Sequence, residues 1–237
     1  MLAATLTGLA LGVLAGCAPD AGDSGRVERA DAPGIQTATH EKRADAPGEQ
    51  AAAPEERAVA AERKAATLEE QASSEGSGRP PTPVEVIAPK EAQAVDPQGK
   101  EALDDAITCL ARSIYWETKG EELAGMQAVA SVVMNRLGQP GFPDTVCGVV
   151  KQGQESGSCQ FSWWCDGRPD AVQEPERYSI AKEVARQALN GQLVDRTGGA
   201  TYFHHKRVSP DWSNTFTRTT VIGPHRFYKP ADGDGKP

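Results

Sequence analysis

Every aromatic residue of this 237-residue chain lies at or after Tyr115. The first hundred residues carry sixteen acidic and ten basic side chains and are rich in Ala, Pro, Glu and Gly. A segment of this kind buries too little apolar surface to offset the chain entropy that folding removes. We therefore expect a disordered linker over residues 18–100, one folded domain over residues 101–230 and a flexible tail over residues 231–237.

Part of the expected linker has a helical composition. Residues 54–72 are rich in Ala, Glu and Arg, but only Val59 and Leu68 are large and apolar. Two such residues are too few for the seam of a coiled coil. The sequence therefore predicts no more than a transient helix in this segment.

The first sixteen residues are almost wholly apolar or small and are followed by Cys17. The run is too short to cross a bilayer comfortably and is typical of an export signal. Its ending, Leu-Ala-Gly-Cys, resembles the signal of bacterial lipoproteins, in which this cysteine is lipidated. Residues 1–17 would then be a signal peptide, and the exported protein would be anchored to a membrane in the periplasm, at the outer membrane in a Gram-negative cell. A cleaved signal peptide with an incidental cysteine is the alternative.

Three apolar patterns of helical period follow in the second half of the chain. Lys119 and Gly120 form the joint between the first two, and Gly191 ends the third, which covers residues 178–190. The inward side chains of the three patterns are Ile107, Leu110, Ala111, Ile114 and Tyr115; Met126, Val129, Ala130, Val133 and Leu137; and Ala181, Val184, Ala185 and Leu189.

Glu117 stands at the end of the first pattern, directly after Tyr115 and Trp116. A carboxylate in the last turn of a helix faces the negative end of the helix dipole. Packing against two aromatic rings would also remove water from it. Both effects favour the neutral acid, so Glu117 is our candidate for a general acid.

Glu121 has a different expected role. Thr118 and Glu121 have the spacing of a capping box, in which the glutamate side chain returns to the backbone amide of the threonine. We expect this structural role for Glu121, with a supporting carboxylate near the site as the alternative. Asp166, in an aromatic loop between two cysteines, is the other possible supporting carboxylate.

Four cysteines remain once Cys17 is assigned to lipid: Cys109, Cys147, Cys159 and Cys165. An exported domain with four cysteines is expected to form two disulfides, for which three pairings are open. A zinc site built from these cysteines with His204, His205 or His225 is the alternative, although no pair has the CxxC spacing.

Six blocks of sequence carry a resemblance to a known family. In chain order they are LARSIYWETKGEELAGMQAVASVVMNRL from Leu110, FPDTVCGVV from Phe142, CQFSWWCDG from Cys159, GATYFHH from Gly199, SPDW from Ser209 and IGPHRFY from Ile222. Together they resemble the SleB-type cell wall hydrolase domain, the catalytic domain family of spore cortex-lytic enzymes, over about residues 103–229. Where the family usually reads Glu-Ala-Arg-Gly-Glu, this chain has Glu117-Thr-Lys-Gly-Glu121.

The resemblance implies an α+β, lysozyme-like fold with a mainly helical core and a small β element. It also implies cleavage of peptidoglycan glycan strands without a cofactor, with Glu117 at the position of the family's catalytic glutamate. A raised-pKa glutamate suits this chemistry because the leaving oxygen of a glycosidic bond needs a proton.

The substrate-binding candidates combine polar groups with flat rings, as carbohydrate clefts do. Alternation in residues 201–205 predicts a strand with one face toward the cleft, and residues 222–228 also read as strand-like. The candidates are Gln160, Ser162, Trp163, Tyr202, His204, Trp212 and His225.

One dominant carboxylate favours a lytic transglycosylase that cuts between N-acetylmuramic acid and N-acetylglucosamine, whereas hydrolysis generally uses a second carboxylate. A hydrolytic muramidase, a Cys/His peptidoglycan peptidase with a free thiol at Cys159 or Cys165, and a non-catalytic peptidoglycan-binding lipoprotein are the alternatives. We expect a monomer that binds glycan strands. The domain has no basic excess, which argues against nucleic acid as a partner.

Overall fold

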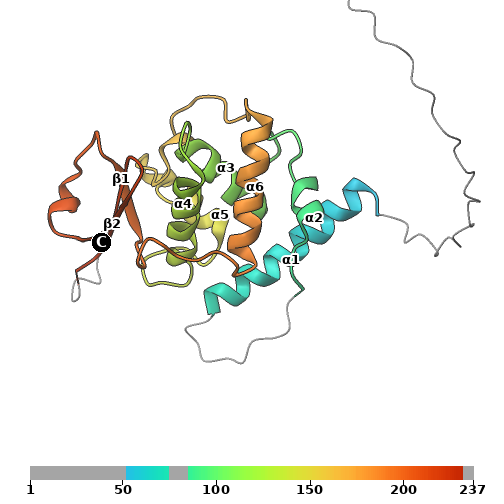
Figure 1. Cartoon of the computed structure of the whole chain (residues 1–237), viewed down its shortest axis with the longest axis horizontal. Coiled ribbons are helices and arrows are strands. Elements are labelled where there is room, and N and C mark those ends of the chain that lie inside the picture. Colours follow the sequence, from blue (N-terminus) through green and yellow to red (C-terminus); the bar gives the residue numbers. More distant parts are fainter. Residues whose placement is uncertain (1–51, 75–84, 232–237) are drawn as a thin grey trace, which may run out of the picture. The chain divides into compact units, whose positions relative to one another are not determined.

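The structure is a computed structural model that describes residues 52–74 and 85–231, all within one compact unit, Glu49–Pro237. Four helices, α3 to α6, form its centre. Three strands lie on one side of these helices, and two further helices, α1 and α2, lie on the other side (Figure 1). The predicted α+β class, mainly helical with a small β element, is confirmed.

Helix α3, Ala106–Glu117, is the centre of the core. Asp105 caps it by accepting a hydrogen bond from the amide of Thr108 at 2.8 Å. Every residue from Ala106 to Tyr115 is buried, because α3 is covered by α4, α5 and α6. This burial fixes the end of α3, and with it the backbone of Glu117.

The remaining helices surround α3. They are α4, Leu123–Arg136; α5, Val146–Lys151; and α6, Pro175–Leu189; with short 3-10 turns η2, Gln154–Ser156; η3, Ser162–Trp164; and η4, Asp211–Asn214. The apolar side chains predicted to face inward from the three helical patterns are all buried. Helix α6 ends just before Gly191, whose positive φ of 66° suits a residue without a side chain.

The sheet is antiparallel in the order β1-β3-β2, with β1 at Tyr202–His205, β2 at Thr217–Ile222 and β3 at His225–Lys229. Gly223 and Pro224 make the tight turn between β2 and β3. Ala128 and Val132 of α4 pack with Ala200 and Phe227 in a small second core. This contact holds the β2–β3 turn and the first residue of β3 next to the start of α4.

The expected linker is shorter than predicted. Residues Pro54–Ser74 form helix α1, whose Ala61 and Ala65 are fully buried against the domain. Lys64 of α1 forms a bidentate ion pair with Glu91, at 2.8 and 3.0 Å, on helix α2, Pro89–Ala94. A helix with a small-residue face can dock without large apolar side chains, which explains why composition missed it. Residues 18–51 and 75–84 of the predicted linker, the signal with Cys17, and residues 232–237 lie outside the described residues.

Residues 85–100 also belong to the domain. Ile87, Val95 and Asp96 are buried, and Asp96 forms an ion pair with Arg112 of α3 at 2.8 Å. The folded domain therefore begins before residue 101, and α1 adds to it from further upstream.

The four cysteines of the domain are joined as Cys109–Cys147 and Cys159–Cys165, with Cα atoms 5.3 and 6.1 Å apart. The first bond ties α3 to α5, and the second closes the loop that contains η3. Within the described ranges, no helix is both long and apolar enough to cross a membrane.

Candidate active site

A cleft of about 600 Å³ opens beside the end of α3. It brings together the α3–α4 joint, the η3 loop and the sheet, three regions that are distant in sequence. Its lining residues are Trp116, Glu117, Lys119, Ser162, Trp163, Asp166, Arg168, Pro169, Asp170, Gln173, His205 and His225.

Glu117 is the last residue of α3 and lines this cleft. The residue is half-buried because one side opens to the cleft, but protein surrounds its carboxyl group closely. The pKa of Glu117 is raised to about 7, mainly by burial; His225 and Arg136 lower it, and the charge of Glu121 raises it. An acid with this pKa is largely protonated just below neutral pH and can also become a base, as general acid–base catalysis requires.

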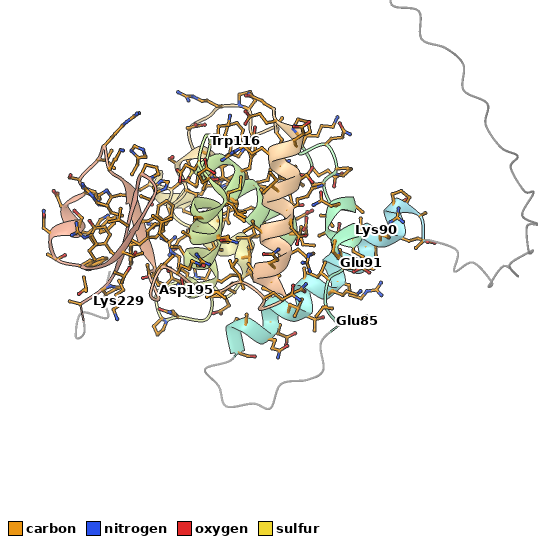
Figure 2. All side chains as sticks on the ribbon, viewed as in Figure 1. Glu85, Lys90, Glu91, Trp116, Asp195 and Lys229 are labelled. Carbon is orange, nitrogen blue, oxygen red and sulfur yellow. A yellow bond between two sulfur atoms is a disulfide. The ribbon has the colours of Figure 1, made fainter. Side chains whose placement is uncertain are left out.

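Aromatic rings form one wall of the cleft. Trp116 stacks on Trp163 with ring centroids 6.5 Å apart and donates a hydrogen bond to the Asp170 carbonyl at 3.2 Å. The ammonium group of Lys119 lies 3.9 Å from the centre of the Trp116 ring. In Figure 2, Trp116 lies far from Glu91, which marks the contact between α1 and α2, so α1 packs away from this wall.

The capping box predicted for Glu121 is not formed. The Thr118 hydroxyl donates to the Ile114 carbonyl at 2.7 Å and so completes the end of α3. Helix α4 has Glu122 at its N-cap, without a side-chain hydrogen bond. The Glu121 carboxylate instead reaches His225, with 3.2 Å between Oε1 and Nδ1.

Strand β1 presents the opposite face from the one we predicted. His204 is buried, and its Nε2 lies 3.0 Å from the Tyr228 hydroxyl. The ring of Tyr202 packs on Phe216 with centroids 4.8 Å apart, and the ring of Trp212 lies 5.4 Å from that of Tyr228 between centroids. Tyr202, His204 and Trp212 therefore do not line the cleft; they stabilise the far side of the sheet.

His205 is the cleft residue that sequence reasoning did not select. It pairs across the sheet with His225, and the two rings lie 5.6 Å apart on the cleft face. The prediction of a strand is correct, but the alternation assigned the wrong face of that strand to the cleft. The apolar Phe203, two residues earlier, was the available signal, since it shares the face of His205 and packs on Phe227.

Arg136 is a second residue that the sequence analysis missed. It is 2% exposed, and its Nε donates to the Thr201 carbonyl at 2.7 Å. Burial lowers its pKa to about 10, and its charge lowers the pKa of Glu117. The sequence signal for its burial was its spacing, because a helical residue three positions after the inward Val133 lies on the same face of α4. Predicted Gln160 lies here, 3.4 Å from Arg136, and not in the cleft lining.

The predicted Ser162, Trp163, Asp166 and His225 all line the cleft. Trp163 is only 6% exposed, so it serves both the core and the wall. The exposed Asp166 accepts a hydrogen bond from the Arg168 amide at 2.9 Å. The cleft lining thus includes the residues predicted for it from the η3 loop and from the start of β3.

Two other hollows lie outside this cleft. One, of about 370 Å³, lies among α1, α4 and α6, with Asp195 as the one titratable residue in its lining; the other, of about 510 Å³, is lined by Glu101, Asp104 and Lys151 but not by Glu117. Among the residues that the structure describes, no group of three or more His, Cys, Asp and Glu side chains is placed to hold a metal ion. The cleft at Glu117 is the candidate site because it holds the carboxyl group whose pKa burial raises to about 7.

Comparison with known proteins supports a family. A family model described as Cell Wall Hydrolase matches residues 120–228, a range that begins just after Glu117. The catalytic domain of the Bacillus cereus SleB protein, a solved structure, is 32% identical, with 52% of this chain and 89% of that chain covered and a TM-score of 0.43.

Two curated relatives are spore cortex-lytic enzymes. The enzyme of Halalkalibacterium halodurans is 36% identical over 129 residues, which are 52% of this chain and 34% of that protein. The enzyme of Oceanobacillus iheyensis is 35% identical over 134 residues, 56% of this chain and 44% of that protein. The chain thus spans less than half the length of either relative. The family match and these relatives support a SleB-type cell wall hydrolase domain within this chain.

Proposed function

We propose that the domain cleaves the glycan strands of peptidoglycan at the β-1,4 bond between N-acetylmuramic acid and N-acetylglucosamine, with Glu117 as general acid. The observation that carries this proposal is a carboxyl group with a pKa of about 7 in a cleft walled by two stacked tryptophans. Flat rings are suited to sugar faces, and a neutral carboxylic acid is suited to a glycosidic oxygen.

In the proposed reaction the C1–O4 bond breaks while Glu117 transfers its proton to the departing O4. The muramic 6-hydroxyl oxygen then bonds to C1, and the proton of that hydroxyl returns to Glu117. This is the lytic transglycosylase route, which produces a 1,6-anhydro end and consumes no water. It needs one carboxyl group that acts first as acid and then as base.

The state of the two carboxylates expected as possible supporting groups favours this route over hydrolysis. Asp166 lines the cleft but is exposed and bonded within its own loop, and Glu121, outside the cleft lining, lies against His225. A hydrolase would generally need one of them free to activate water or to attack the sugar.

The peptidase alternative requires a free thiolate, and the described cysteines are all in disulfides. A purely binding function does not require an acid whose pKa is raised to about 7. Both observations favour the glycosidase.

Glu117→Gln tests the proposal. An amide cannot donate the proton, so we expect at least a hundredfold loss of glycan cleavage with peptidoglycan binding retained. The matched control is Glu122→Gln, an exposed acid outside the cleft, which should keep wild-type turnover.

Mass spectrometry of the released fragments identifies the reaction. Anhydromuramic ends support the transglycosylase, reducing ends support hydrolysis, and cleaved stem peptides would favour the peptidase. If the Glu117 variant retains more than about a tenth of the turnover, the assignment of the acid is wrong.

We also propose that Cys17, outside the described residues, carries the lipid anchor of an exported enzyme. The apolar run that ends at this cysteine supports the proposal. Metabolic labelling with a fatty acid should mark the wild-type chain and not Cys17→Ser; an unlabelled wild-type chain would indicate an ordinary signal peptide.

A further inference from the structure

The Glu121 carboxylate turns into the protein at the joint between α3 and α4. Its Oε1 lies 3.2 Å from Nδ1 of His225, the first residue of β3. The side chains are only 11% and 5% exposed, respectively. The pair therefore joins two elements that are about one hundred residues apart in sequence, directly beside the proposed acid.

Space is left for this carboxylate from two directions. A Cβ atom at Gly125 in the first turn of α4 would lie 2.4 Å from Glu121 Oε2, which is too close for any real contact. A Cβ atom at Gly223 in the β2–β3 turn would lie 3.6 Å from the same oxygen. The two glycines thus flank the position of the buried oxygen.

The backbone of the joint is also held in place. Arg177 of α6 donates through Nη2 to the carbonyl oxygens of Thr118 and Glu121, the second at 2.7 Å. The direction of the Glu121 side chain is therefore set by a contact from a third element. A surface glutamate that merely closed a helix would not need this support.

His225 is equally constrained. Its ring meets the edge of Phe203 with centroids 5.2 Å apart, lies 5.6 Å from His205, and lines the cleft with Glu117. The contact between Glu121 Oε1 and His225 Nδ1 is not a regular hydrogen bond, and neither His225 Nδ1 nor Glu121 Oε2 has a hydrogen-bond partner among the described residues. Buried polar atoms without partners cost stability, which points to a role for the pair other than holding the fold together.

We propose that Glu121 and His225 form a positioning pair at the edge of the cleft that holds Glu117, and that the pair controls the change of Glu117 from proton donor to proton acceptor. The proposal deepens the function proposed above and rests on it. Within the pair, His225 lowers the pKa of Glu117, and the Glu121 carboxylate raises it. When either side chain is removed, the effect of the other on Glu117 is no longer offset.

The remaining charges around the pair are few. Arg136 lowers the pKa of Glu117 together with His225, whereas Glu121 raises it. His205 is the titratable neighbour of His225, and Lys206 and Arg207 are the cations that act on His205. Because the two members of the pair act on Glu117 in opposite directions, their removal has opposite consequences that a structural role would not produce.

The test is the pH dependence of kcat/KM for glycan cleavage, whose alkaline limb reports loss of the protonated acid. Glu121→Gln removes a like charge, so the limb should move to lower pH. His225→Gln removes the side chain that lowers the pKa of Glu117, so the limb should move to higher pH. Each displacement should be about one pH unit, and the double variant should fall between the single variants.

Controls separate this effect from general surface charge and from misfolding. Glu122→Gln, on the adjacent exposed residue, should leave the limb unchanged, and Glu121→Asp, which keeps the carboxylate, should return it toward the wild-type position. Should Glu121→Gln fail to fold, the upward displacement in His225→Gln decides the question alone. The proposed pair is wrong if the alkaline limb stays in place in Glu121→Gln and His225→Gln. It is also wrong if the limb moves equally in Glu122→Gln. An active Glu117→Gln would instead overturn the proposed function.

Discussion

Asp96 and Glu117 are two enclosed carboxyl groups of the same domain with opposite environments. Asp96 is fully buried and accepts hydrogen bonds from four groups: the amides of Lys100 and Glu101, at 2.7 and 3.0 Å, Arg112 Nε at 2.8 Å and the Tyr178 hydroxyl at 2.7 Å. Burial alone would raise its pKa, but these hydrogen bonds lower it below the usual value. For Glu117 burial prevails, and its pKa rises to about 7.

The difference shows that burial does not by itself decide whether the pKa of a carboxyl group rises or falls. What distinguishes the two acids is the number of donors that reach the carboxylate. Asp96 joins residues 96–101 to α3 and α6 and stays ionised. Glu117 has nearby charges but no donor at hydrogen-bond distance among the described residues, so it can exchange its proton.

The largest effect on stability is expected from Asp96→Asn. The amide would leave the buried Arg112 guanidinium without its counter-charge, and broken buried pairs typically cost about 3–5 kcal/mol. Urea unfolding should show this loss, while Asp104→Asn, on an exposed residue, should be nearly neutral. A loss below about 1 kcal/mol would mean that Asp96 is no more structural than a surface acid.

Glu117→Gln should instead increase the stability of the folded protein. Because the folded pKa of about 7 lies above the reference value of 4.5, the unfolded chain releases its proton first, and folding stability falls as pH rises between these values. The glutamine variant lacks this penalty, so above pH 7 it should be more stable than the wild type by on the order of 1–3 kcal/mol. Near pH 4 the two proteins should unfold alike. An equal difference at both pH values would exclude a raised pKa.

The smallest effect is expected where α1 docks. Lys64→Met removes the partly buried ion pair with Glu91 and should cost about 1 kcal/mol or less, with faster proteolysis of α1. Lys90→Met, on the exposed residue beside Glu91 in Figure 2, is the control and should change neither quantity. Equal behaviour of the two variants would show that the Ala61 and Ala65 face alone holds the helix.

The sequence was sufficient to predict helices α3, α4 and α6 and the position of Glu117 at the end of α3. Three runs of helical period correspond to α3, α4 and α6, because their inward side chains are large and regularly spaced. The position of Glu117 follows from the same period, since it marks where α3 ends. Local pattern is enough when the determining contacts are a few residues apart.

The remaining features depend on contacts between distant segments. Whether β1 turns His204 or His205 toward the cleft is decided by its pairing with β3, and a shift of one residue exchanges the two faces. The capping-box spacing at Thr118 was present, but a partner one hundred residues away, His225, attracts the Glu121 carboxylate. Helix α1 escaped prediction because its buried face consists of alanines, which are also common in unfolded segments.

Gly125 has a consequence for how such sequences diverge. A glycine in a helix costs up to about 1 kcal/mol relative to alanine, and here that cost is tied to the space occupied by the Glu121 carboxylate. A descendant that replaced Glu121 with a small residue would be free to acquire alanine at position 125 and to gain that stability. The two positions should therefore change together during evolution, and a homologue that keeps the glutamate should keep the glycine four residues later.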